Sequence, residues 1–162
     1  LQRGQAAGGD REGQALLKYL RYQTGDLTNG EGVRCTLYVS GCNHFCKGCH
    51  NPVTWNARNG HPVCDELIEQ IIKDLKDHTG FSLSGGDPLF PPNREPVAAL
   101  LKRIKEAHPE KDIWLWTGYR YDEVKDLEAL RYVDVLIDGR YEQDKPTLKP
   151  WRGSDNQELI RL

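Results

Sequence analysis

Apolar and polar residues follow one another from Gly32 onward in a pattern that predicts strands separated by helices. Runs rich in β-branched, aromatic and leucine side chains, most of them ended by a glycine, predict four strands, at residues 33–39, 81–84, 112–117 and 133–138. Apolar residues at helical spacing predict three helices, at residues 65–77, 95–107 and 122–130. A last strand is expected at residues 158–162.

Strands that alternate with helices indicate βαβ units and a parallel sheet. Four or five such units are too few for the closed eight-stranded barrel, which takes about 250 residues. We therefore expect an α/β fold, an open partial βα barrel of four or five parallel strands in a single domain. In such folds the chemistry lies beyond the carboxyl ends of the strands. The segments expected to meet there are a cysteine-bearing loop at 42–50 and the turns at 85–87, 117–118 and 138–139.

Residues 1–17 lack this pattern and are rich in Gln, Gly, Ala, Arg and Asp. Such a segment buries too little apolar surface to offset the entropy lost on ordering it. We expect a flexible tail at 1–17 and one folded domain at 18–162, because domains commonly span about 100–200 residues.

Charge and composition exclude several classes of protein. Lys and Arg total 22 and Asp and Glu total 24, a net charge of −2, which argues against a globally basic nucleic-acid binder. The longest apolar runs are far shorter than the about 20 residues of a membrane-spanning helix. We expect a cytoplasmic protein with neither a nucleic-acid nor a membrane partner. Its five cysteines, an odd number, do not indicate a disulfide framework.

Three cysteines stand close together at 42, 46 and 49. Three thiolates on one short loop can hold three corners of a 4Fe-4S cluster and leave one iron open to an external ligand. The alternative is a structural zinc site with His44 or His50 as fourth ligand, in a binding module that regulates a partner. A structural zinc needs no adjoining pocket, so the glycine turns at the later strand ends favour the iron cluster. Cys35 and Cys64 are expected to be packing or exposed thiols.

The loop resembles the hallmark of the radical S-adenosylmethionine (SAM) superfamily, Cys-x3-Cys-x2-Cys after the first strand. A second hallmark, a Gly-Gly-Glu/Asp turn after the second strand, is matched at 85–87. Within the superfamily, the chain is similar to the activases of anaerobic ribonucleoside-triphosphate reductases. The segments that carry this closer resemblance are 29–32, 34–37, 40–42, 49–51, 54–55, 84–89, 114–119, 138–140 and 151–154.

The resemblance implies a 4Fe-4S cluster on Cys42, Cys46 and Cys49, with SAM on the open iron. It implies reductive cleavage of SAM to a 5′-deoxyadenosyl radical, which generates a glycyl radical on the catalytic subunit of the reductase. No separate acid or base residue is expected, and the implied electron donor is a flavodoxin-like protein. The alternative target is another glycyl-radical enzyme or a small molecule.

The resemblance also implies a set of residues around SAM: Gly48, Cys49, His50, Gly85, Gly86, Asp87, Thr117, Asp138 and Arg140. The two adjacent glycines let the backbone approach SAM closely, and Asp87 can accept a hydrogen bond from its ammonium group. Many family members have an aromatic residue where this chain has Gly48, so the His50 ring is expected against the adenine. Asp87 is equally typical of a turn before proline, and the last three residues of the set are also ordinary strand-end polar residues.

Overall fold

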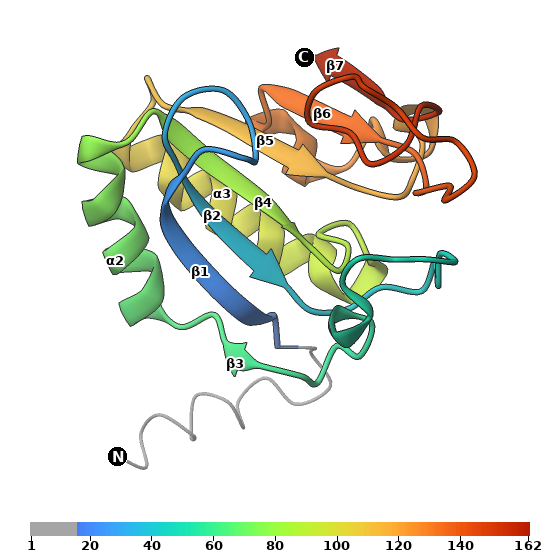
Figure 1. Ribbon diagram of the computed structural model, residues 1–162. Helices are drawn as coiled ribbons and strands as arrows, with labels where there is room; N and C mark the ends of the chain where they lie inside the picture. The colour runs from blue at the N-terminus through green and yellow to red at the C-terminus, as the bar shows by residue number, and fades with distance from the viewer. Residues whose placement is uncertain (1–15) are drawn as a thin grey trace.

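The computed structural model describes residues 16–162 (Figure 1). The tail expected at 1–17 therefore lies outside the described residues except for its last two. Of these, Leu17 is buried, and its carbonyl accepts a hydrogen bond from the Val63 amide at 2.9 Å.

A seven-stranded sheet forms the centre of the molecule, in the order β3-β1-β2-β4-β5-β6-β7. The strands are β1 (Lys18–Asp26), β2 (Arg34–Val39), β3 (His61–Pro62), β4 (Gly80–Gly85), β5 (Asp112–Trp116), β6 (Val135–Asp138) and β7 (Glu158–Arg161). The four inner strands, β2, β4, β5 and β6, are parallel. Their carboxyl ends point to the same side in Figure 1. These are the four strands that the apolar runs predict.

The predicted open barrel of parallel strands is wrong, because the sheet is mixed. β1 and β3 pair antiparallel on one side of the parallel strands, and β7 pairs antiparallel with β6 on the other. A parallel neighbour requires a crossover of a dozen or more residues. The loop from β1 to β2 is too short for one, so these two strands form a hairpin. The longer segment from β6 to β7 contains no helix that could make a crossover, and it returns antiparallel.

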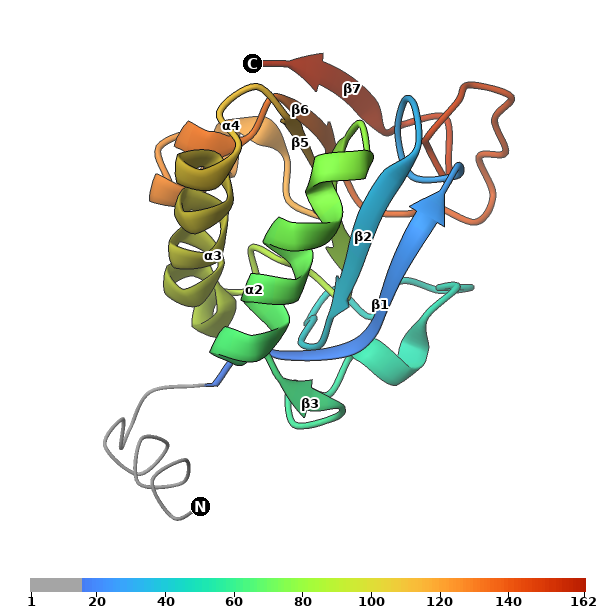
Figure 2. The same cartoon turned by 90° about the vertical axis from the view of Figure 1, so that its left-hand side faces the viewer.

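The described chain has three α-helices, α2 (Asp65–Asp74), α3 (Arg94–Ala107) and α4 (Tyr121–Val124). Figure 2 shows α2 and α3 side by side on one face of the sheet, with the long loops after β2 and β6 on the other side. Short 3-10 helices occur at η1 (Pro52–Thr54), η2 (Leu75–Asp77), η3 (Pro91–Asn93) and η4 (Glu128–Tyr132). The helix predicted over 122–130 is split into α4 and η4, because Leu127 between them has extended backbone angles.

The main core lies between the two long helices and the sheet. It includes Ile71 of α2, Leu101 of α3, and Leu37 and Leu83 from the central strands, all fully buried. A smaller cluster covers the opposite face, where Trp114 packs with Val135 and Ile137. Successive side chains of β5 thus pack on opposite faces of the sheet, as the two-residue period of a strand requires.

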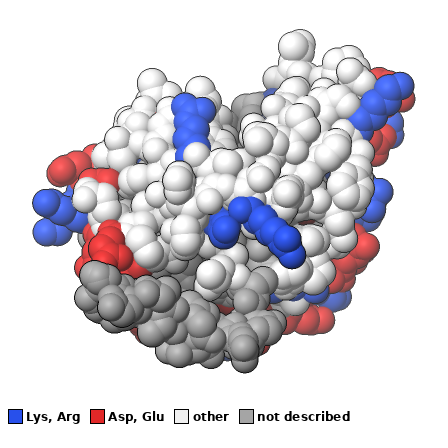
Figure 3. Space-filling model, turned by 90° about the horizontal axis from the view of Figure 1, so that it is seen from below, with Lys and Arg blue, Asp and Glu red and all other residues white. Residues whose placement is uncertain are grey.

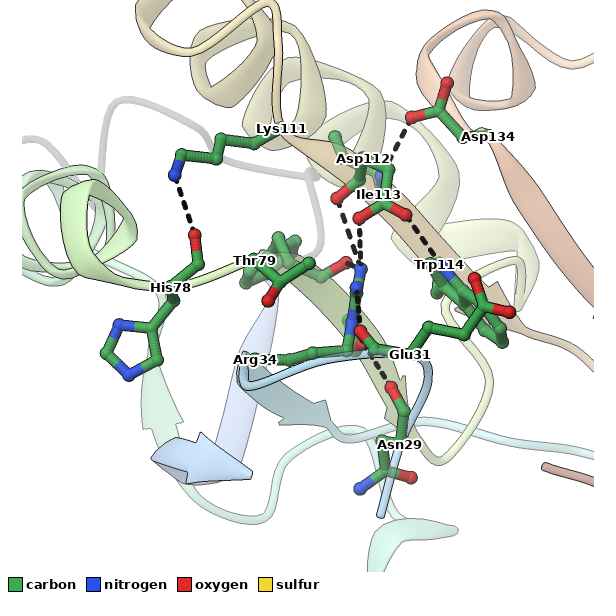
Figure 4. Close-up of polar contacts among 12 residues, drawn as sticks. Asn29, Glu31, Arg34, His78, Thr79, Lys111, Asp112, Ile113, Trp114 and Asp134 are labelled. Atoms are coloured by element: carbon green, nitrogen blue, oxygen red, sulfur yellow. Dashed lines mark hydrogen bonds and ion pairs between the residues drawn. The ribbon is translucent and has the colours of Figure 1, made fainter. Parts of the chain in front are cut away.

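A buried arginine joins three of the four inner strands, β2, β4 and β5, near their amino ends, as Figure 4 shows. Arg34 of β2 is fully buried and donates to the Ser82 hydroxyl at 2.7 Å and the Phe81 carbonyl at 3.0 Å in β4. It also forms an ion pair with Asp112 of β5 at 2.9 Å. A buried guanidinium is tolerated only when it is paired in this way. The network therefore holds the strands in register and brings their carboxyl ends to one edge.

Among residues 16–162, no helix is both long enough and apolar enough to pass through a lipid bilayer.

Candidate functional site

The loop that follows β2 carries the three clustered cysteines. We call residues 40–51 the cysteine loop, and Cys42, Cys46 and Cys49 the cysteine triad. Each thiol is free and partly buried, and all three line one cavity of about 270 Å³. The turn at the end of β4 and Thr117 at the end of β5 line it as well. The cavity therefore opens at the carboxyl edge of the parallel strands, where the sequence predicts the chemistry.

A tight turn brings the last two members of the triad together. The Cys49 amide donates to the Cys46 carbonyl at 3.1 Å, and Gly48 between them has a φ of 75°. This left-handed conformation favours glycine at the third position of such a turn. A Cβ at Gly48 would also lie 2.6 Å from the Gln143 side chain. Gly48 is thus explained by the turn and its neighbour, and it does not line the cavity.

The surroundings of the triad carry few acidic groups. No Asp or Glu occurs between Gly32 and Cys64, whereas Lys47 and Arg58 lie in this segment. Figure 3 views the underside of the molecule, which is largely uncharged, with Lys and Arg side chains on it and carboxylates toward its margins. This segment therefore adds no negative charge beside the thiols.

The structure brings most of the predicted site residues to the triad. Those that line the cavity with the triad are His50, Gly85, Gly86, Asp87 and Thr117. Asp138 and Arg140 instead line a neighbouring cavity of about 560 Å³. The Asp138 carboxylate accepts the Tyr121 amide at 2.7 Å. The two cavities share His44, Gly118 and Gly139, so they adjoin one another.

The paired glycines pack against the chain itself. A Cβ at Gly86 would lie 2.6 Å from the Gly41 carbonyl oxygen and 2.9 Å from that of Thr54. A Cβ at Gly85 would lie 2.4 Å from the backbone of Val39. The absence of side chains therefore lets the end of β4 meet the start of the cysteine loop, besides any role toward a cofactor.

Asp87 is almost completely buried, with 1% of its surface exposed. Its carboxylate accepts hydrogen bonds from the amides of Leu89 and Gly118, both at 2.9 Å. It also accepts from the Thr117 hydroxyl at 2.8 Å and from the His44 imidazole at 2.6 Å. A carboxylate offers about four acceptor positions. Hydrogen bonds from the chain itself thus fill the acceptor positions that the resemblance implied for the ammonium group of SAM.

Several residues that line the cavity were not among those predicted around SAM. They are Asn29, His44, Asn51, Trp55, Ser84, Trp116, Tyr141 and Gln157. The Tyr141 ring lies 4.9 Å from the His50 ring, centroid to centroid, and forms part of the loop after β6. Some of the others stand in segments that carry the resemblance, but Tyr141 lies outside those segments, so its contact with His50 requires the tertiary structure.

The donor atoms around the cavity fit an iron–sulfur cluster. Three thiols face one cavity, and sulfur ligands suit iron. Among the described residues, no three or more His, Cys, Asp or Glu side chains are gathered around a single ion position. Two buried polar atoms beside the cavity, Nδ1 of His44 and Nε1 of Trp55, have no hydrogen-bond partner among the described residues. A cofactor held in the cavity would lie next to both groups.

The cavity also affects the chemistry of the first triad thiol. Burial raises the pKa of Cys42 to about 11, and the nearby carboxylate of Asp87 acts in the same direction. The thiol is therefore protonated at neutral pH, and a metal that binds this sulfur must displace the proton.

The chain matches a family described as a 4Fe-4S single cluster domain over residues 28–160. It is 50% identical, over 145 residues, to the anaerobic ribonucleoside-triphosphate reductase-activating protein of Enterobacteria phage T4, covering 88% of this chain and 93% of that protein. The protein of the same name from Vibrio cholerae is 49% identical over 154 residues, with 90% of this chain and 99% of that protein covered. The Escherichia coli K12 protein is 45% identical over 153 residues, with the same coverage.

Proposed function

The chain belongs to the family of anaerobic ribonucleoside-triphosphate reductase-activating proteins, and on this basis we propose that it activates such a reductase by radical SAM chemistry. It is an iron–sulfur enzyme, and its cofactors are a 4Fe-4S cluster and SAM. The observation that carries the proposal is that three cysteine thiols line one cavity with the Gly-Gly-Asp turn, inside a segment that matches a 4Fe-4S domain. The match to an iron–sulfur family leaves the zinc-binding module without support.

When bound, the reduced cluster and SAM together supply a 5′-deoxyadenosyl radical, which takes a hydrogen atom from a glycine of the reductase. The protein's own part is to bind, orient and shield. In the proposal, the cysteine triad supplies three thiolates and leaves one cluster corner open for SAM. The small, partly enclosed cavity limits the access of water and other hydrogen donors to the reacting atoms.

The cofactor contacts are proposed residue by residue. His50 and Tyr141 present neighbouring rings at the cavity, which suits the flat face of an adenine. Gly85 and Gly86 line the same cavity. The Gly86 amide already donates to the Val39 carbonyl at 2.7 Å, so the proposed contact with the methionine part of SAM is through backbone carbonyl groups. Thr117 and Asp87 support this side of the cavity through their mutual hydrogen bond.

Three further residues were expected near SAM. Asp138 and Arg140 lie next to Gly139, which lines both cavities, so we propose that they act at the part of SAM nearest this boundary. Gly48 contributes through the turn that places Cys49.

For the electron donor we propose a flavodoxin-like protein. The segment around the cysteine loop carries Lys47 and Arg58 and no carboxylate. Such a surface suits an acidic electron carrier, because complementary charge speeds encounter.

Anaerobic reconstitution tests the proposed function. We expect about four iron and four sulfide ions per chain, formation of 5′-deoxyadenosine from SAM when dithionite is added, and a glycyl radical by EPR when the reductase is added. Normal cluster loading without SAM cleavage would contradict the proposed chemistry. SAM cleavage with a glycyl radical only on a different enzyme would contradict the proposed target.

A further inference from the structure

A histidine inside the cysteine loop is buried against the turn at the end of β4. His44 stands between the first two members of the triad, and 4% of its side chain is exposed. Its Nε2 lies 2.6 Å from a carboxylate oxygen of Asp87. A carboxylate accepts hydrogen bonds and does not donate them, so Nε2 of His44 carries the proton and donates it.

The space around the imidazole is shaped for that ring. A Cβ at Gly118 would lie 2.5 Å from Cδ2 of His44 and 2.7 Å from Nε2, so a side chain at 118 would displace the ring. The Tyr119 ring meets it edge to face at a centroid distance of 4.7 Å. The residues that follow β5 thus form a close-fitting receptacle for a side chain from a loop far away in the sequence.

Asp87 connects this receptacle to the entry of the cysteine loop. Its backbone amide donates to the Gly41 carbonyl at 2.7 Å. The Asn93 side chain donates to the carbonyls of both Ser40 and Asp87, at 2.9 and 3.1 Å. The turn after β4 therefore contacts the cysteine loop at two points. The Asp87 amide bonds to the loop backbone just before Cys42, and the Asp87 carboxylate bonds to His44.

We propose that His44 and Asp87 are positioning residues, whose buried hydrogen bond sets the first half of the cysteine loop in place for the cluster and SAM. The inference rests on the proposed function, because it requires the triad to hold a cluster. It assigns Asp87 a different task from the direct ammonium contact expected from the sequence, since its acceptor positions are filled by the chain. Residues that hold metal ligands in place do not touch the metal, yet their substitution commonly lowers metal affinity about 10–100-fold.

Replacement of His44 by leucine or glutamine tests the proposal. Leucine fills the receptacle without a donor, whereas the glutamine amide can donate to Asp87. His108 is the matched control. Its Nε2 lies 2.7 Å from the Ile72 carbonyl oxygen, 11% of its side chain is exposed, and it follows the carboxyl end of α3, at the opposite edge of the sheet from the triad.

Two readouts other than turnover are measured on the reconstituted holoenzyme. One is the rate at which an iron chelator removes the cluster, and the other is the SAM concentration that half-converts the EPR spectrum of the reduced cluster. For H44L we expect normal initial iron content, iron loss about tenfold faster and SAM affinity about tenfold weaker, as for loss of a hydrogen bond to a charged group. For H44Q we expect both values within about threefold of the unmodified protein, and for H108L no change beyond that range.

The outcomes separate the inference from the proposed function. Equal iron-loss rates and SAM affinities in H44L and H108L would overturn the positioning role. Loss of all iron in both H44L and H44Q would also overturn it, because His44 would then act as a ligand. If H44L fails to fold, the H44Q variant provides the test. A rate of iron loss and a SAM affinity like those of the unmodified protein support the inference, and values about tenfold worse overturn it. Absence of SAM cleavage in the unmodified protein would instead contradict the proposed function.

Discussion

Substitution of Gly86 by alanine probes the close contact between the end of β4 and the cysteine loop. The φ of Gly86 lies outside the left-handed region, so alanine is acceptable to the backbone and the effect comes from the added methyl group. Its Cβ would lie 2.6 Å from the Gly41 carbonyl oxygen. An ordinary carbon–oxygen contact is about 3.3 Å, so the two segments must separate by about 0.7 Å.

This movement also affects a hydrogen bond. The Gly41 carbonyl accepts the Asp87 amide at 2.7 Å, and a separation of this size stretches the bond beyond the usual limit. Overpacking costs about 1–3 kcal/mol, and the weakened hydrogen bond adds about 1 kcal/mol. We expect a loss of about 2–4 kcal/mol, which for a chain of this size lowers Tm by about 5–15 °C.

Thermal unfolding of the apo-protein, followed by circular dichroism, measures this loss of stability. Titrations with iron and with SAM measure whether the site still binds both. Gly25→Ala is a comparison of the opposite kind, because Gly25 has a φ of 65° and nothing within 4 Å of the added Cβ. Its loss of about 1–2 kcal/mol comes from the left-handed backbone alone, whereas the loss in Gly86→Ala comes from packing alone. If the Gly86→Ala protein has the Tm of the unmodified protein and binds iron and SAM normally, the close packing of turn and loop is refuted.

Three further predictions concern the ligands, the adenine contact and the response to acid. Alanine at any position of the cysteine triad should abolish iron and sulfide binding, whereas Cys35→Ala and Cys64→Ala should retain both; complete iron loss in Cys64→Ala would contradict the ligand assignment. Tyr141→Ala should weaken SAM binding about tenfold through loss of ring stacking, with unchanged iron content, and an unchanged SAM affinity would argue against the contact. Burial favours a raised pKa for Asp26, but hydrogen bonds from Thr36 and the neighbouring loop outweigh it and lower the pKa. The ionised Asp26 therefore stabilises the fold above its unfolded pKa of about 4 and loses this effect as the pH falls. Urea unfolding of Thr36→Val should show a loss of about 1 kcal/mol at pH 7 that shrinks toward pH 3, and a difference independent of pH would contradict this account.

Much of the inner architecture follows from local sequence. The parallel strands β2, β4, β5 and β6 are buried on both faces, so their sequences contain short apolar runs that periodicity detects. Helices α2 and α3 each bury one stripe against the sheet, which produces the helical spacing. The cysteine triad and the Gly-Gly-Asp turn are short motifs, recognisable without knowledge of the fold.

The edge of the sheet was less accessible to prediction. β1 is mostly polar or half-buried along its length, as is usual for an antiparallel strand with one face toward solvent. Its pattern therefore predicted no strand there, although the folded domain was expected to begin at residue 18. Without β1, β3 and the antiparallel pairing of β7, the alternation of strands and helices indicated a parallel barrel.

The inner strands, the two long helices and the three-cysteine motif could thus be predicted, because each depends on residues close together in the chain. The mixed sheet and the environment of the triad required knowledge of the tertiary structure. His44 meets Asp87 from 43 positions away, and His50 meets Tyr141 from the loop after β6. Such contacts depend on strand order and register, which are set by pairing between distant segments and leave no periodic trace in the sequence.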